Sequence, residues 1–340
     1  MKKIINSFLV FLFLLCACEN SSSEKLPITT NNEEALRYYR KALEFYLTTD
    51  FPEGWASLDS ALIIDPNFAM ASLNRWHPDP SIRSKNRKKA YSLIKTVSNA
   101  EKYILKANRA EDEGNLDSAL FYIKKLVKEY PNSYESYNQL GVIYGTRNEL
   151  GLSEKAFKQS LELYPNNYMA YTYLFGQHIM YGYYDLLPTE ERDVNKGLKY
   201  AEKLIELKPK SAHGYHAKAN CYRQIGEFEK AIPLYDKSVE LSKGTTAEAS
   251  ENYVSAHNIM FAGDFEKARD RYKQALKVVK ELQTETSIKT FITISYLFQR
   301  NFEGALDNLY SMEEALKNNK AIDSSYLLWQ LREIERLKFI

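Results

Sequence analysis

The 340-residue sequence predicts an all-α protein in which helices pair into a repeating array. Three observations support this fold class. Apolar residues recur at helical spacing, as in Ala119, Tyr122, Ile123 and Leu126. Alternating apolar and polar runs, which are typical of strands, are almost absent. Small residues and prolines also recur at fixed distances, which is the signature of internal repeats.

Length and composition exclude several other classes. A chain of this length forms roughly two or three domains of about 150 residues or one long array. With 44% hydrophobic residues, wholesale disorder is not expected. The 46 basic and 44 acidic side chains are nearly balanced, so no global field attracts nucleic acid. Three cysteines are too few for a disulfide framework.

The first element, residues 1–17, reads as a secretory signal that is removed. Two lysines precede an unbroken apolar run at 8–15 that is too short to span a membrane. Its end, Leu15-Cys16-Ala17-Cys18, resembles the bacterial lipobox. This resemblance implies that Cys18 becomes the lipid-modified first residue of the mature protein. The alternative is an ordinary signal peptide followed by a coincidental cysteine.

Residues 18–31 form the next segment, which is polar, rich in short side chains and without periodicity. We expect a flexible tether between the lipid and the folded body. The formal charge of +2 is due to Lys2 and Lys3, so the chain that remains after removal of the signal is neutral. Cys221 is then the only cysteine of the folded part, where a buried, inert core residue is expected.

The remaining elements are helix pairs. Residues 32–98 form degenerate N-terminal repeats, interrupted where Trp76-His77-Pro78-Asp79-Pro80 breaks a helix. Residues 99–319 form the main array, with an insertion at about 181–195. Residues 320–340 form a capping helix, whose apolar stripe would cover the last repeat.

Two recurring markers define the repeats. Four prolines each follow an amphipathic helix and end it, and two of them lie 34 residues apart. These prolines are Pro66, Pro131, Pro165 and Pro209. A small residue lies about twelve positions before each stop, where it lets two helices approach closely. These small residues are Gly54, Ala119, Ser153, Gly197, Ala231, Ala268 and Ala305.

The best-formed repeat reads Tyr137-x2-Leu140-Gly141-x2-Tyr144, then Ser153-x3-Phe157, then Pro165. It resembles the tetratricopeptide repeat (TPR) family, whose pattern is W-x2-L-G-x2-Y, A-x3-F and P over 34 residues. The resemblance implies a right-handed α-solenoid of about eight TPR-like helix pairs plus a C-terminal capping helix. A helical array with another repeat geometry is the alternative.

The sequence contains no recognisable catalytic or phosphate-binding motif. His213 and His216 are three residues apart, but no cysteine or carboxylate completes a zinc site at the usual spacing. We therefore expect no enzyme activity, no metal and no cofactor. Residues 83–109 contain nine basic side chains and one acid, Glu101, which suits either a solvated face or contact with anionic lipids or an acidic partner.

The TPR resemblance implies that the first helix of each pair lines a concave groove. The groove stripe maps to Asn138, Gln139, Thr172, Tyr173, His213, His216, Asn220, Arg223, Tyr253 and His257. Such polar and aromatic side chains suit recognition of a peptide segment, and simple solvation is the alternative. Tyr183 and Tyr184 in the insertion are candidates for loop contacts.

Together these features predict a membrane-anchored scaffold or adaptor lipoprotein that binds envelope proteins or peptide segments through its groove. By family resemblance we expect a bacterial envelope location, with the outer membrane favoured over the inner and a periplasmic or surface-facing body. No nucleic-acid partner is expected. The alternative function is a surface lipoprotein that captures glycans, with the insertion tyrosines stacking on sugar rings.

Overall fold

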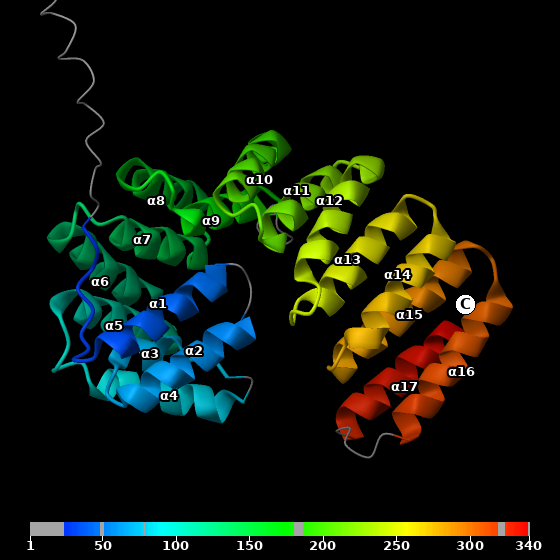
Figure 1. The fold of residues 1–340 in the computed structure, drawn as a ribbon, viewed down its shortest axis with the longest axis horizontal. Coiled ribbons are helices and arrows are strands. Elements are labelled where there is room, and N and C mark those ends of the chain that lie inside the picture. The colour runs from blue at the N-terminus through cyan, green and yellow to red at the C-terminus, as the bar shows by residue number, and fades with distance from the viewer. Residues whose placement is uncertain (1–23, 48–50, 78, 180–185, 319–323, 339–340) are drawn as a thin grey trace, which may run out of the picture. The chain divides into compact units, whose positions relative to one another are not determined.

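The computed structural model describes residues 24–47, 51–77, 79–179, 186–318 and 324–338, without the side chains of residues 189 and 324–328 (Figure 1). This part of the chain contains seventeen α-helices and one short 3₁₀ helix, η2 (Thr189–Glu191), and no strand. The predicted all-α fold is therefore confirmed. None of these helices is long and apolar enough to cross a bilayer.

The helices fall into two compact units. Unit 1 comprises residues up to 29 and 79–170, and unit 2 comprises 30–78 and 171–340, so the division falls within α9. Unit 1 contains α4 (Pro80–Ser92), α5 (Asn99–Asp112), α6 (Leu116–Glu129), α7 (Tyr134–Thr146), α8 (Leu150–Leu163) and the start of α9 (Tyr168–Ile179).

Unit 2 contains two runs of helices. The first run is α1 (Glu33–Leu47), α2 (Phe51–Ile64) and α3 (Ala69–Asn74). The second run follows α9 and is α10 (Val194–Leu207), α11 (Ala212–Gln224), α12 (Phe228–Ser242), α13 (Glu248–Phe261), α14 (Phe265–Val278), α15 (Leu282–Phe298), α16 (Phe302–Asn318) and α17 (Ser324–Lys338).

Local sequence explains where the helices start and stop. Ser98 caps α5 in a capping box, in which Glu101 bonds back to the Ser98 backbone N–H. The turns inside helix pairs place Gly114, Gly226 and Gly263 at φ of 73°, 77° and 92°. Glycine adopts this left-handed conformation at little steric cost, which explains why the few glycines recur there.

In unit 1 the pair α7–α8 shows how the repeat packs. Gly141 lies against the ring of Phe157, and a Cβ on Gly141 would come within 2.7 Å of that ring. The Ser153 hydroxyl donates a hydrogen bond of 2.7 Å to the Gly141 carbonyl. Phe157 is fully buried. The small and aromatic positions of the repeat therefore set the close approach of the two helices.

In unit 2 the same positions build the core. Ala231 and Ala268 are fully buried, as are Tyr235 and Tyr272 four residues after each. Cys221 is also fully buried and its thiol is free, as predicted. Burial raises the pKa of this thiol to about 12, so it stays protonated and unreactive.

The last helix, α17, packs against α16. Ile334 is buried with Leu309, Met312 and Leu316 in one apolar cluster. Lys338 adds an ion pair of 2.5 Å to Glu313 of α16. These contacts give α17 the position on the last repeat that its apolar stripe predicts.

A flexible tether was predicted for residues 18–31. The structure describes residues 24–31 of this segment, and it contradicts the prediction for residues 24–29. Residues 24–29 are bound to unit 1 by backbone and side-chain hydrogen bonds, and Leu26 is buried. Composition alone could not reveal these contacts, because the partner residues lie 69 or more residues away in the sequence. The signal segment and Cys18 lie outside the described residues.

Candidate functional site

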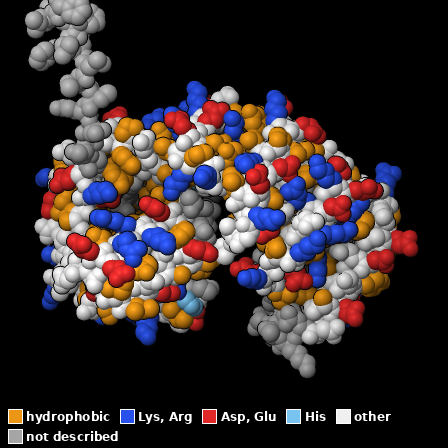
Figure 2. All heavy atoms as spheres, viewed as in Figure 1, with side chains coloured by type: hydrophobic (Ala, Val, Ile, Leu, Met, Phe, Trp, Pro, Cys, Tyr) orange, Lys and Arg blue, Asp and Glu red, His pale blue; other side chains and the backbone are white. Residues whose placement is uncertain are grey.

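The predicted groove residues are divided between the two units. Asn138 and Gln139 lie on α7 of unit 1, and the other eight lie on α9, α11 and α13 of unit 2. The loop candidates Tyr183 and Tyr184 lie outside the described residues. Charged side chains of both signs are interspersed over the viewed face (Figure 2).

Asn138 does not have the position that a groove residue needs. Its side chain is buried, and its Oδ1 accepts hydrogen bonds from the Ser160 hydroxyl at 2.8 Å and from Asn167 Nδ2 at 2.9 Å. These bonds join α7 to α8 and to the turn before α9, so Asn138 is a structural residue. Gln139, the next residue, is half-buried.

On α9, Thr172 is half-buried and Tyr173 is exposed. Tyr171, beside them, faces inward and packs 6.2 Å from the ring of Tyr200 on α10. Tyr173 is therefore more exposed than the packing residue Tyr171, whereas Thr172 is half-buried like it.

The side chains of α11 and α13 meet at His216. Its Nδ1 lies 2.8 Å from Oε2 of Glu251, which also accepts a hydrogen bond of 2.5 Å from the Ser238 hydroxyl. Burial alone would raise the pKa of Glu251, but the hydrogen bonds and charge of His216 and the bond from Ser238 outweigh it and lower that pKa. His216 therefore links α11 to α13, which are the first helices of two successive pairs.

His213 lies one turn before His216 on the same helix. Burial, with a smaller contribution from the nearby His216, lowers the pKa of His213 to about 4. The side chain is therefore neutral at neutral pH. Among the described residues no group of three His, Cys, Asp or Glu side chains is arranged to hold a metal ion.

Asn220 and Arg223 continue the same face of α11. The Tyr235 hydroxyl donates a hydrogen bond of 2.6 Å to Asn220 Oδ1, which turns the amide Nδ2 away from that contact. The Arg223 guanidinium has no ion pair or hydrogen bond to the described part of the chain. Both side chains are half-buried. The N–H donors of the Asn220 amide and of the Arg223 guanidinium are therefore partly shielded from water.

His257 on α13 lies among aromatic rings. Its ring centroid is 4.0 Å from Phe291, 4.4 Å from Tyr253 and 5.5 Å from Tyr272. His257 Nδ1 lies 2.7 Å from the Tyr253 carbonyl and donates to it, which leaves Nε2 of the neutral ring as an acceptor. Burial, with a smaller contribution from the charge of Arg223, outweighs the hydrogen bond to Tyr253 and lowers the pKa of His257 to about 4.

These residues form one candidate site, which we call the Arg223 face: Asn220, Arg223, Tyr253 and His257. It offers a cation with no ion pair among the described residues, amide donors, a neutral imidazole acceptor and an aromatic wall. A carboxylate would gain charge-assisted hydrogen bonds there, and an adjoining apolar group would contact the rings. These four residues suit binding, and none of them is an activated nucleophile.

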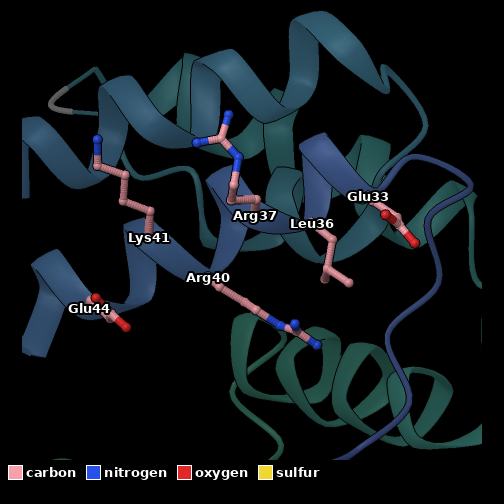
Figure 3. Close-up of a pocket in the computed structure, with 6 residues that line it drawn as sticks. All are labelled: Glu33, Leu36, Arg37, Arg40, Lys41 and Glu44. Atoms are coloured by element: carbon pink, nitrogen blue, oxygen red, sulfur yellow. The ribbon is translucent and has the colours of Figure 1, made fainter.

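The sequence analysis missed a second polar surface, on α1. Glu33, Arg37, Arg40 and Glu44 recur at helical spacing and, with Leu36 and Lys41, line a hollow (Figure 3). Arg37 pairs with Glu34 at 3.1 Å, whereas Arg40 has no ion pair within the described residues. The helical spacing of these α1 residues can be recognised in the sequence. The groove residues, however, were predicted only from the later, better-formed repeats.

An apolar ridge along the turns within the helix pairs of unit 2 was also not predicted from the sequence. Phe261 and Phe298 are 50% and 60% exposed. Each packs in a tilted arrangement against the first residue of the preceding helix, with ring-centroid distances of 6.1 Å for Phe228–Phe261 and 6.0 Å for Phe265–Phe298. The repeated turn followed by phenylalanine was the sequence signal.

Comparison with known proteins agrees with this architecture. Residues 134–167 and 212–245, which correspond to α7–α8 and α11–α12, match the family model of the tetratricopeptide repeat. Mitochondrial import receptor subunit TOM70 of Mus musculus is 20% identical over 191 residues, which are 56% of this chain and 26% of that protein. The chain thus spans about a quarter of this relative's length.

Among solved structures, the APC/C hetero-tetramer Cut9-Hcn1 gives a TM-score of 0.53 at 14% identity, over 90% of this chain and 57% of that one. A tetratricopeptide repeat protein from Parabacteroides merdae ATCC 43184 gives a TM-score of 0.45 at 12% identity, over 91% and 100% of the two chains. The first likeness concerns the fold alone.

Proposed function

We propose that this chain, which is built of tetratricopeptide repeats, is a lipid-anchored scaffold of the bacterial envelope. It binds peptide segments of envelope proteins at the Arg223 face and performs no catalysis. The anchor raises the local concentration of the bound partner near the membrane, which strengthens any second contact between them. TPR proteins bind protein partners, and the geometry below narrows the class of segment.

The observation that carries this proposal is the guanidinium of Arg223, which has no ion pair or hydrogen bond to the described part of the chain. A half-buried cation without a counter-ion is costly unless a ligand supplies the negative charge. The neutral His257 and the Tyr253 ring beside it suit the backbone and an apolar side chain of a peptide. We therefore expect a segment with an acidic side chain or a terminal carboxylate next to an apolar residue.

The anchor rests on the sequence around Cys18. The basic start, the apolar run and the Leu15-Cys16-Ala17-Cys18 end match the order of a bacterial lipoprotein signal. Lipid chains give membrane affinity through the burial of methylene groups, at about 0.8 kcal/mol each. An outer-membrane location is the preferred form of this proposal.

The test of partner binding is in-cell photocrosslinking from Tyr253, followed by mass spectrometry. A crosslinker at Gln274, an exposed position on α14, is the matched control. We expect envelope proteins from Tyr253 and not from Gln274, and we expect Arg223→Gln to reduce the yield at least tenfold. Arg271→Gln, which removes an arginine already paired with Asp236, should leave the yield unchanged.

Two outcomes of this experiment contradict the proposal. One is a Tyr253 crosslinking pattern that equals the Gln274 pattern. The other is capture of glycan and no protein, which would support the glycan-binding alternative. The anchor is tested separately, because Cys18→Ser should move the protein from the membrane to the soluble fraction. Continued membrane retention of that variant would refute the lipid site.

A further inference from the structure

Residues 24–29, which we call the strap, are docked on unit 1 in an extended conformation (Figure 1). The first contacts are to the turn between α6 and α7 and to the start of α7. The Glu24 backbone N–H donates to the Asn132 carbonyl at 3.2 Å, and the Leu26 N–H donates to Glu135 Oε2 at 2.6 Å. Leu26 is 6% exposed, so its side chain is part of the core.

The second half of the strap is bound to the start of α5. The Ser98 hydroxyl donates to the Pro27 carbonyl at 2.9 Å. The Thr29 N–H and hydroxyl both donate to Glu101 Oε2, at 2.9 and 2.5 Å. Glu101 is fully buried and belongs to the capping box of α5. The strap is therefore held by the same carboxylate that starts the helix.

The sequence prepares the strap for this conformation. Leu26 precedes Pro27, and a residue before proline is restricted to extended backbone angles. Proline itself has a fixed φ and loses little entropy on docking. Bonds to a buried carboxylate are charge-assisted and stronger than neutral ones. Docking thus costs less entropy than ordering a chain rich in glycine and serine.

All strap partners lie at one end of the helices of unit 1. Ser98 and Glu101 are at the start of α5, and Asn132 and Glu135 are at the turn before α7 and in its first turn. The turns that end α5 and α7 lie at the opposite end. A helix of 14 residues, such as α5, is about 21 Å long. The two ends of unit 1 are therefore about 20 Å apart.

The docked strap limits how far unit 1 can lie from Cys18. Between Cys18 and Glu24 the sequence has five intervening residues, so six Cα–Cα steps at about 3.5 Å give a reach of about 20 Å. A tether that was free up to residue 31 would reach about 45 Å on the same arithmetic. This difference is as large as the height of unit 1 itself.

We propose that the strap end of unit 1, formed by the start of α5 and the α6–α7 turn, is the membrane-facing surface of the protein. The docked strap keeps this end within about 20 Å of the lipid surface. The opposite end of unit 1 then points away from the bilayer. This placement rests on the proposed lipid anchor at Cys18.

The test uses the full-length, lipid-modified protein in phosphatidylcholine vesicles. One fluorophore is placed at Lys128→Cys, an exposed residue at the strap end, and another at Thr146→Cys, an exposed residue at the opposite end, both in a Cys221→Ala background. A short-range metal quencher on the lipid headgroups reports proximity. We expect severalfold stronger quenching at position 128 than at position 146.

Two variants test the role of the strap. An insertion of fourteen glycine and serine residues between Ser23 and Glu24 should lengthen the tether and remove the difference between the labels. The double variant Leu26→Asp and Thr29→Val should release the strap, which faster hydrogen exchange of residues 24–29 would show, and should reduce the difference. An intact strap with no difference between labels refutes the placement.

Flotation of the vesicles separates this inference from the proposed function. Protein that does not float with the vesicles refutes the anchor and, with it, the placement. Protein that floats but shows equal quenching at both labels leaves the anchor intact and overturns the placement alone. An insertion that leaves a strong difference unchanged also overturns it, because the strap would then not set the orientation.

Discussion

Replacement of Gly141 by alanine tests the packing of the best-formed repeat. An added Cβ would lie 2.7–2.8 Å from three atoms of the Phe157 ring, closer than real Cβ contacts allow. Because Phe157 is fully buried, its ring has little room to move away. Overpacking of this kind costs about 1–3 kcal/mol. Alanine returns about 1 kcal/mol through its helix propensity. We expect a net loss of about 1 kcal/mol.

Gly151→Ala is the matched control. This glycine lies in the first turn of α8, and nothing is within 4 Å of its ideal Cβ. Only the helix propensity then changes, so the variant should gain stability by up to about 1 kcal/mol. The two alanine substitutions, placed in one helix pair, are thus predicted to have opposite signs.

A double-mutant cycle isolates the contact. In a Phe157→Leu background the ring is gone, so Gly141→Ala should become neutral or stabilising, with a coupling energy of about 1–2 kcal/mol. The assays are urea unfolding followed by circular dichroism and hydrogen exchange of the α7 and α8 amides. Exchange is needed because two compact units need not unfold in one step. Stabilisation by Gly141→Ala in the unaltered background would refute the close approach.

Three further predictions follow from buried polar groups. The pKa values of His213 and His257 lie at about 4, below the ordinary 6.5, so the unfolded chain takes up their protons first. The free energy of unfolding should therefore fall as pH drops from about 6.5 to 4. In thermal unfolding, His257→Gln should make this dependence of stability on pH less steep, and an unchanged dependence would contradict the prediction. Asn138→Ala should cost about 1 kcal/mol in urea unfolding, since the Ser160 hydroxyl and Asn167 Nδ2 each lose one of their two acceptors; a neutral effect would argue against its buried network. Tyr235→Phe should cost about 1 kcal/mol through its lost hydrogen bond of 2.6 Å, while Tyr272→Phe, whose hydroxyl contacts only a methionine sulfur at 3.9 Å, should cost less; equal losses would refute this distinction.

Most of the fold was readable because its determinants are local. The small residues Ala231 and Ala268 mark close helix contacts, and the aromatics four positions later fill the core. Asp79 caps α4 and Pro80 is its first residue, so these two residues set the start of the helix at the break that the sequence predicts. Each of these signals acts within one or two turns of a helix, so the pattern alone predicts it.

The strap was not readable, because its partners are distant in sequence. Leu26 and Glu135 are 109 residues apart, and Thr29 and Glu101 are 72 residues apart. A polar segment with one Leu-Pro dipeptide has the composition of a tether, and only its contacts with distant residues, among them the buried Glu101, show that it is docked. Long-range pairing of this kind has no periodicity.

The candidate site was predicted in part for a similar reason. Helical spacing groups Asn220 with Arg223 on one face of α11, and in the structure both are half-buried. The same mapping placed Asn138 in the groove, although its amide is buried in a network with Ser160. A groove position and a core position can be neighbouring residues of one helix. For a short polar side chain, the repeat pattern does not show which of the two positions it occupies.

The central claim is that the Arg223 face binds a peptide segment through the arginine charge. The most direct measurement is the affinity of the purified protein for a synthetic peptide that corresponds to the segment crosslinked from Tyr253. Arg223→Gln is predicted to weaken binding at least tenfold, and Arg271→Gln is predicted to leave it unchanged. Equal affinities of the Arg223→Gln variant and the unaltered protein would contradict the claim.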